Sequence, residues 1–131
     1  MEKTFAMIKP DAVSDRHVGG ILHMIEEAGF KLSEMRLMTL TLEQAKDFYS
    51  VHRDRPFYEE MCADMCKGPV VAMTLIKTDA VAAFRTLIGA TDPKQASHGT
   101  IRQKFGRSIG SNAIHGSDSL ENAVVEHAFF F

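Results

Sequence analysis

The chain has 131 residues, a length typical of one domain and too short for a two-lobed protein kinase, a TIM barrel or a two-domain dehydrogenase. Hydrophobic residues make up 45% and charged residues 24%, as in a globular domain with a buried core. The formal net charge of −2 gives no indication of a nucleic-acid partner. No apolar run approaches the roughly 18 residues of a membrane-spanning helix, and no signal peptide is recognisable. Cys62 and Cys66 are too few for a disulfide scaffold, so we expect a cytoplasmic protein with reduced thiols.

Hydrophobic patterning predicts five elements in the first half of the chain. Gly29 is a suitable C-terminal stop for the first helix. Thr41-x-x-Gln44 is a capping box that opens the second helix. The predicted elements are a strand over 4–8, a helix near 21–28, a strand over 31–40, a helix after Thr41 and a helix over 57–66.

The second half begins with the apolar run 70–76, which predicts a buried strand after the turn at Gly68-Pro69. A helix follows, capped by Thr78 or Asp79 and closed by Gly89. We expect a short strand over 113–115 and a last helix opened by Asp118-x-x-Glu121, an analogue of the capping box.

Residues 90–112 show no long periodicity and are predicted to form a loop. A loop of that length in a compact domain is usually functional or a mistaken assignment. The order of elements predicts an α+β fold for a single domain over 1–131. It is compatible with a ferredoxin-like, four-stranded antiparallel sheet with helices packed on it.

Two short motifs match known catalytic patterns by chance. Residues 106–110 (GRSIG) fit the G-x-S-x-G nucleophile elbow, but only 21 residues follow, too few for the acid and histidine of a hydrolase. Residues 52–54 (HRD) match the start of a protein-kinase catalytic loop, but no D-F-G and no glycine-rich loop accompany them. We expect neither motif to be catalytic.

The segment around His115 carries the strongest chemical signal. A histidine with its ordinary pKa of about 6.5 is largely neutral at pH 7, so its ring nitrogen can attack phosphorus directly. Gly116 leaves room for a bulky group, and the helix predicted to open near Ser119 favours anions at its N-terminus. Glu126 in that helix can hold the other ring nitrogen and fix the tautomer. A histidine at a strand end is more often structural, and the neighbouring residues reverse that expectation.

Asn112–Ser119 (NAIHGSDS) strongly resembles the active-site signature of nucleoside diphosphate kinases, and the resemblance extends over almost the whole chain. Other segments match the family in the right order: residues 5–12 (FAMIKPDA), 52–57 (HRDRPF), 89–93 (GATDP) and 99–102 (GTIR). The resemblance implies phosphoryl transfer from a nucleoside triphosphate to a diphosphate through a phosphohistidine, with ping-pong kinetics.

The resemblance also implies the site residues. His115 matches the phosphorylated histidine, with Glu126, Ser117 and Tyr49 around it. Stacking of the base on Phe57, with Ile109 on its other side, would make one pocket accept many nucleotides. The nucleotide-binding residues implied are the cations Lys9, Arg85 and Arg102, the neutral contacts Thr91 and Asn112, and the aromatic Phe57.

Magnesium is the implied cofactor. No direct protein ligand is expected, and Asp118 either orients waters on the metal or is simply a helix cap. The implied partners are nucleoside tri- and diphosphates and further copies of the chain, as a tetramer, a hexamer or a dimer. We expect the aromatic end at residues 129–131 to pack on the core or on a neighbouring subunit.

Two rival functions can be separated by the residues present. A phosphocarrier needs His115 but no nucleotide pocket, and a nucleotide-sensing module needs the pocket but no nucleophile. This chain has both the histidine and the residues of the nucleotide pocket. The other five histidines are expected to have packing or surface roles: His17, His23, His52, His98 and His127.

Overall fold

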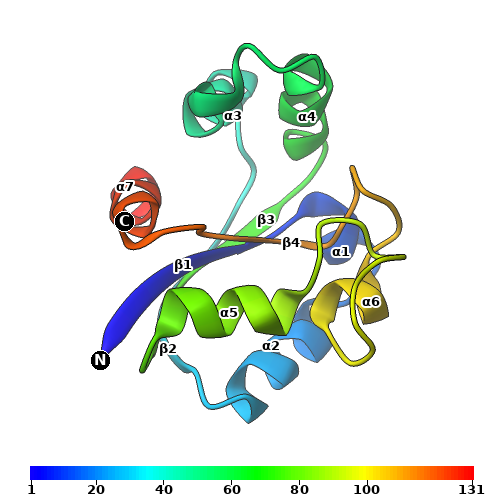
Figure 1. The fold of residues 1–131 in the computed structure, drawn as a ribbon. Coiled ribbons are helices and arrows are strands. Elements are labelled where there is room, and N and C mark those ends of the chain that lie inside the picture. Colours follow the sequence, from blue (N-terminus) through cyan, green and yellow to red (C-terminus); the bar gives the residue numbers. More distant parts are fainter.

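The computed structural model describes all residues from Met1 to Phe131. Figure 1 shows a single sheet with helices on both of its faces. The strands are β1 (Glu2–Ile8), β2 (Lys31–Met38), β3 (Val70–Lys77) and β4 (Ile114–Gly116). The helices are α1 (Pro10–Ser14), α2 (Val18–Glu27), α3 (Leu42–Phe48), the 3₁₀ turn η1 (Ser50–His52), α4 (Tyr58–Met65), α5 (Ala80–Ile88), α6 (Ile101–Phe105) and α7 (Leu120–Phe130).

The four strands pair in the order β2-β3-β1-β4, and every pairing is antiparallel. This arrangement confirms the predicted α+β class and the four-stranded antiparallel sheet. β4 is an edge strand of three residues that pairs only with β1, where His115 lies opposite Met7. The pairing places His115 near the carboxyl end of β1, and the next residue along from that strand, Lys9, bonds through its amide to the carbonyl of Ala113.

The two faces of the sheet bury different side chains, because successive residues of a strand point to opposite sides. One face packs against α2 and α5. Its core is mainly aliphatic, with residues from β1, β3, β4 and the two helices, and includes the fully buried Phe84. The opposite face packs against α3, α4 and α7 and is richer in aromatic and sulfur-containing side chains. Figure 1 shows the α3–α4 pair above the sheet, on the side of β3 and β4.

Three local predictions require correction. The last helix is capped by Ser119, whose hydroxyl accepts a hydrogen bond from the backbone of Asn122, and not by Asp118. The predicted loop over 90–112 contains the helix α6, opened by the hydroxyl of Thr100. A further short helix, α1, follows Lys9 and starts with Pro10, a residue preorganised for the first helical turn.

Other boundaries differ by a few residues. The second strand ends at Met38 and not at Leu40, and the first begins at Glu2. The capping box at Thr41 is present with both of its hydrogen bonds. Asp79 occupies the cap position of α5 with φ 53°, but its side chain makes no capping bond.

Cys62 and Cys66 are free thiols, as predicted. None of the helices is long and apolar enough to cross a membrane. At the aromatic end of the chain, Phe130 is buried and stacks on Phe5 at 5.2 Å between ring centroids. Its neighbours Phe129 and Phe131 are packed less completely, with exposed fractions of 38% and 39%.

Candidate active site

His115 is held by a carboxylate from the last helix. Its Nε2 lies 2.9 Å from Oε1 of Glu126, and the Ser117 hydroxyl donates to the same oxygen at 2.6 Å. Because a carboxylate only accepts hydrogen bonds, Nε2 carries the proton and Nδ1 keeps its lone pair. The arrangement fixes both the tautomer and the orientation of the imidazole.

Three aromatic rings surround the imidazole. Phe48 meets it edge-on with 5.4 Å between centroids, and Phe5 and Tyr49 lie at 6.2 Å each. Tyr49 is buried, and burial, assisted by the charge of Glu126, raises the pKa of its hydroxyl. The rings leave His115 little freedom to rotate away from the carboxylate.

Arg85 and Arg102 bind the carbonyl groups on either side of His115. Arg102 donates to the carbonyl of Ile114 at 2.8 Å and to that of Gly89 at 3.1 Å, and Arg85 donates to Gly116 at 3.4 Å. Burial, and then the charge of Arg85, lowers the pKa of Arg102 to about 10. The two positive charges repel each other, and an anion bound between them would reduce that repulsion.

A second network joins the end of β1 to the two loops that flank α6. The Lys9 ammonium donates to Oδ1 of Asn112 at 3.0 Å and to the carbonyl of Gly110 at 3.2 Å. The amide of Asn112 donates in turn to the carbonyl of Thr91 at 3.1 Å. Burial lowers the pKa of Lys9, and the nearby carboxylate of Asp11 opposes that shift.

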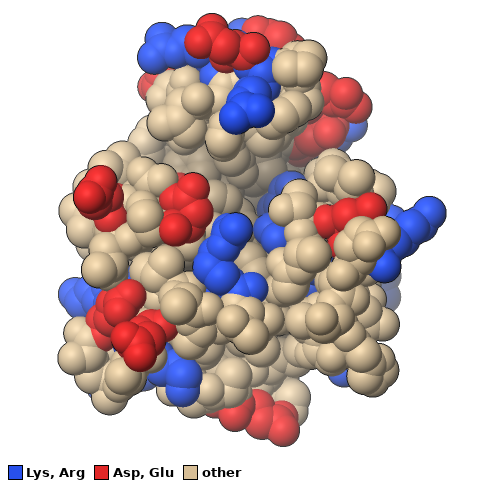
Figure 2. Space-filling view, in the orientation of Figure 1, with Lys and Arg blue, Asp and Glu red and all other residues tan.

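Phe57 and Ile109 remain exposed, with exposed fractions of 47% and 60%. Phe57 is therefore not a buried core aromatic. It stands at the start of α4, on the helical pair that overhangs the sheet. Figure 2 shows a hollow beneath this pair, with lysine and arginine side chains on its walls.

No group of three or more histidine, cysteine or acidic side chains forms a metal-binding cluster. Asp118 lies near His115 and Arg85, and its pKa is lowered mainly by a hydrogen bond from Asn122. A single carboxylate here would fit Mg²⁺, which keeps several waters and is commonly bound through one or two carboxylates and substrate phosphates.

Three of the remaining residues have partners that involve no chemistry: Ser108, His17 and His127. Ser108 of the G-x-S-x-G match lies in an exposed turn, where its hydroxyl accepts a hydrogen bond from Ser111. His17 packs against Phe105, with 4.7 Å between ring centroids. His127 pairs with Glu34 at 2.7 Å.

The sequence model of the family described as nucleoside diphosphate kinase matches residues 2–131. The chain belongs to the nucleoside diphosphate kinase family. As a member it is a phosphotransferase that moves a phosphoryl group from a nucleoside triphosphate to a diphosphate, as its sequence suggested. The nucleoside diphosphate kinase of Flavobacterium psychrophilum is 58% identical over 98% of this chain and 93% of its own length. That of Chlorobaculum tepidum is 54% identical over 100% and 94%.

Solved structures share the fold closely. The Aquifex aeolicus nucleoside diphosphate kinase has a TM-score of 0.98 and 41% identity, covering 99% of this chain and 94% of that one. A halophilic nucleoside diphosphate kinase from Halobacterium salinarum, solved in complex with CDP, has a TM-score of 0.95 and 39% identity, covering 99% and 87%.

Two features of the site were not found from the sequence. Phe48 is the ring closest to His115, but its position in an amphipathic helix indicated only packing. Asp11 accepts a hydrogen bond from the backbone of Ala113, between the two predicted site residues Asn112 and His115. A bond from a side chain to a backbone 102 residues away leaves no local pattern in a sequence.

Proposed function

We propose that His115 carries the phosphoryl group and that both nucleotides use one pocket formed by Lys9, Phe57, Arg85, Thr91, Arg102 and Asn112. The observation that carries this proposal is the 2.9 Å contact between Nε2 and Glu126, which leaves Nδ1 as the free nucleophile. Broad base specificity follows from a pocket whose base contacts are apolar.

In the first half-reaction, the Nδ1 lone pair attacks the γ-phosphorus, and the bond from phosphorus to the β–γ bridging oxygen breaks. The electron pair of that bond leaves on the β-phosphate of the departing diphosphate. The imidazole gains positive charge as the N–P bond forms, and the Glu126 carboxylate stabilises that charge through Nε2–H. The second half-reaction is the reverse, with a terminal oxygen of a new diphosphate attacking the phosphohistidine.

The cations stabilise the transferring group. Arg85 and Arg102 are already held at the carbonyls flanking His115, so little reorganisation is needed when a phosphate enters. Lys9 and Asn112 are joined by a hydrogen bond and are placed to contact the nucleotide together. Thr91 supplies a further hydroxyl on the exposed loop.

Exposed rings at the mouth of the pocket favour a stacking role for Phe57. Stacking uses the face of a base and ignores its hydrogen-bonding edge, so all bases are accepted. Mg²⁺ bound to the nucleotide phosphates would neutralise charge on them, with Asp118 contacting it through water.

The deciding experiment labels the protein with terminally labelled ATP and magnesium, then adds an unlabelled diphosphate. We expect an acid-labile, alkali-stable label that is lost when the diphosphate is added, and no label on His115→Ala. The matched control is His23→Ala, because His23 also pairs with a glutamate, Glu27, at 2.6 Å but on the exposed side of α2. Unchanged labelling of His115→Ala would refute the assignment.

We also propose that the protein is a homo-oligomer in the cytoplasm. β2 is an edge strand with one side unpaired, and Met35 and Leu37 on it are 51% and 66% exposed. An apolar edge of this kind favours pairing with another chain. The free thiols at Cys62 and Cys66 fit a reducing compartment. Sedimentation of Leu37→Lys against the wild type tests the assembly: the variant is expected to sediment as a smaller species.

A further inference from the structure

Ala113, between Asn112 and the strand that carries His115, has a backbone conformation that alanine rarely adopts. Its φ is +75°, and the Ile114 amide donates to the Asn112 carbonyl at 2.9 Å, which closes a γ-turn around it. Gamma-turns with positive φ are rare and strained. Ala113 is fully buried, so contacts with the surrounding protein must hold it in this strained conformation.

The segment after β1 binds both polar backbone groups of this residue. The Lys9 amide donates to the Ala113 carbonyl at 2.9 Å. The Asp11 carboxylate accepts from the Ala113 amide at 3.1 Å. A buried amide left without a partner costs free energy, so Asp11 satisfies a donor that the γ-turn itself leaves open.

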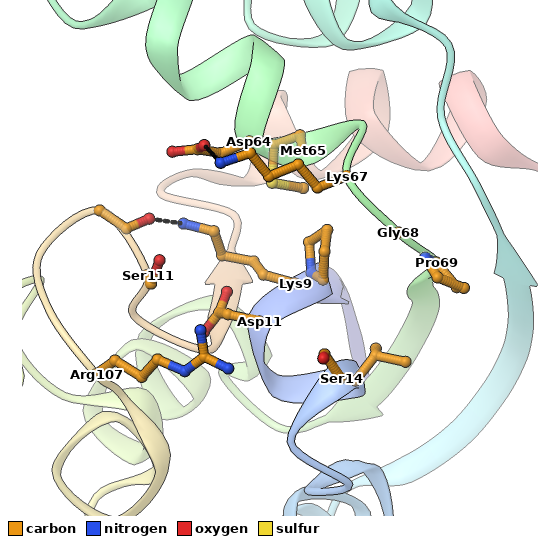
Figure 3. A pocket seen from close by; sticks show the side chains of 13 residues that line it. Lys9, Asp11, Ser14, Asp64, Met65, Lys67, Gly68, Pro69, Arg107 and Ser111 are labelled. Atoms are coloured by element: carbon orange, nitrogen blue, oxygen red, sulfur yellow. Dashed lines mark hydrogen bonds and ion pairs between the residues drawn. The ribbon is translucent and has the colours of Figure 1, made fainter.

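Residues 9–11 therefore hold two successive residues of the site, Asn112 and Ala113. Lys9 binds the side chain of Asn112, and Asp11 binds the backbone of Ala113. Figure 3 shows Asp11 in the cavity beside Lys9, with Arg107 on its other side. This cavity of about 430 Å³ lies between α1, the end of α4 and the loop before β4.

We propose that Asp11 is a positioning residue for nucleotide binding, which acts by locking the γ-turn at Ala113 and so holding the Asn112 amide against Lys9. The inference rests on the proposed roles of Lys9 and Asn112. His115 is held separately, by the pairing of β4 with β1 and by Glu126, so loss of the lock affects nucleotide binding more than the chemical step.

The test compares steady-state constants, with ATP as donor and a nucleoside diphosphate as acceptor. Asp11→Ala is expected to raise KM for the diphosphate about tenfold and to change kcat less than about twofold. Asp11→Asn keeps an oxygen acceptor and is expected to stay within about threefold of the wild-type KM. The control is Glu43→Ala, because Glu43 occupies the same position in the first turn of α3 as Asp11 in α1.

A second substitution isolates the strain. Glycine adopts positive φ at little cost, so Ala113→Gly needs the lock less. In that background, Asp11→Ala is expected to raise KM less than about threefold, a coupling that a purely structural role would not produce. An unchanged KM for Asp11→Ala, an Asp11→Asn variant as impaired as Asp11→Ala, or an equal penalty in both backgrounds would overturn the proposal.

Hydrogen exchange on the wild-type protein tests the proposal without relying on a substituted protein to fold. The Ala113 amide is expected to be protected like the amides of β4, and exchange at the rate of an open chain would overturn the proposal. This measurement does not depend on phosphoryl transfer. Failure of the labelling experiment on His115 would therefore refute the proposed function while leaving the lock at Ala113 testable.

Discussion

The two faces of the sheet each bury a hydrophobic core but use aromatic rings differently. On the face covered by α2 and α5, Phe84 is fully buried and meets Phe30 edge-on at 5.5 Å. On the opposite face, Phe5 and Phe48 also pack in a core, but they additionally enclose His115. The first face contributes Arg85 from α5 but no ring that meets the imidazole, whereas on the other face the packing of the core also orients the reactive side chain.

Removing one ring from each face is the strongest test of this difference between the two faces. Phe84→Ala is expected to lower the free energy of unfolding by about 3–5 kcal/mol, because a fully buried ring leaves a cavity. Its kcat per folded molecule is expected to change less than that of Phe48→Ala, because Phe84 lies against the backbone of Gly116 and not against the ring of His115. Phe48→Ala, a partly buried ring, is expected to cost less stability but to lower kcat. Urea unfolding and turnover measured on both variants check the contrast, and equal kcat values would contradict it.

Replacing Glu126 by glutamine tests the catalytic face without removing volume. The amide can donate to Nε2, which favours the tautomer with the proton on Nδ1 and removes the nucleophilic lone pair. We expect kcat to fall about 100-fold, the upper range for loss of a partner that orients a histidine, with KM for nucleotides nearly unchanged. Rapid-quench measurement of phosphohistidine formation is the readout. A wild-type rate would show that Glu126 has no role in the tautomer.

Phe57→Ala addresses the exposed aromatic at the edge of the catalytic face. Loss of stacking is worth about 1–3 kcal/mol per base, so KM is expected to rise about tenfold or more. The rise should be similar for adenine, guanine, cytosine and uracil nucleotides. Phe57→Tyr keeps the ring and serves as the control. A rise confined to one base would contradict the stacking role.

The smallest expected effect concerns Lys9 and pH. Its pKa in the folded protein lies below the ordinary value of 10.5, mainly because the ammonium is buried. Between the folded pKa and 10.5, the unfolded chain binds more protons, so the stability contributed by this site rises with pH. Relative to Lys9→Met, the wild type should gain stability as the pH rises across that window. Urea unfolding at several pH values tests this, and a constant difference would contradict it.

The main strands and helices were predictable because their signals are local. The apolar run over 70–76 and the capping box at Thr41 each specify an element without reference to the rest of the chain. The short helices α1 and α6 were missed because five residues provide too little periodicity to detect. The sequence offers two adjacent residues, Asp118 and Ser119, that can cap α7. Which of them does so depends on where the helix begins, and the pattern did not fix that position.

The candidate site was predictable through its motifs, and less so through its geometry. The pattern around His115 indicated a histidine–carboxylate pair, and Glu126 lies at hydrogen-bond distance. The same pattern gave no sign that Arg102 would bind two backbone carbonyls or that Ala113 would adopt positive φ. Both features depend on segments that meet only after folding.

Arg102 has one further consequence, for how the chain between α5 and β4 tolerates changes of length. Its guanidinium binds Gly89 at one end of this segment and Ile114 at the other, and so divides it into two smaller rings. The first ring includes the exposed stretch around Lys94 and Gly99, where extra residues would extend into solvent at a small entropic cost. The second ring contains the γ-turn, and an insertion there would shift Asn112. Peptide tags or reporter insertions should therefore be placed in the first ring.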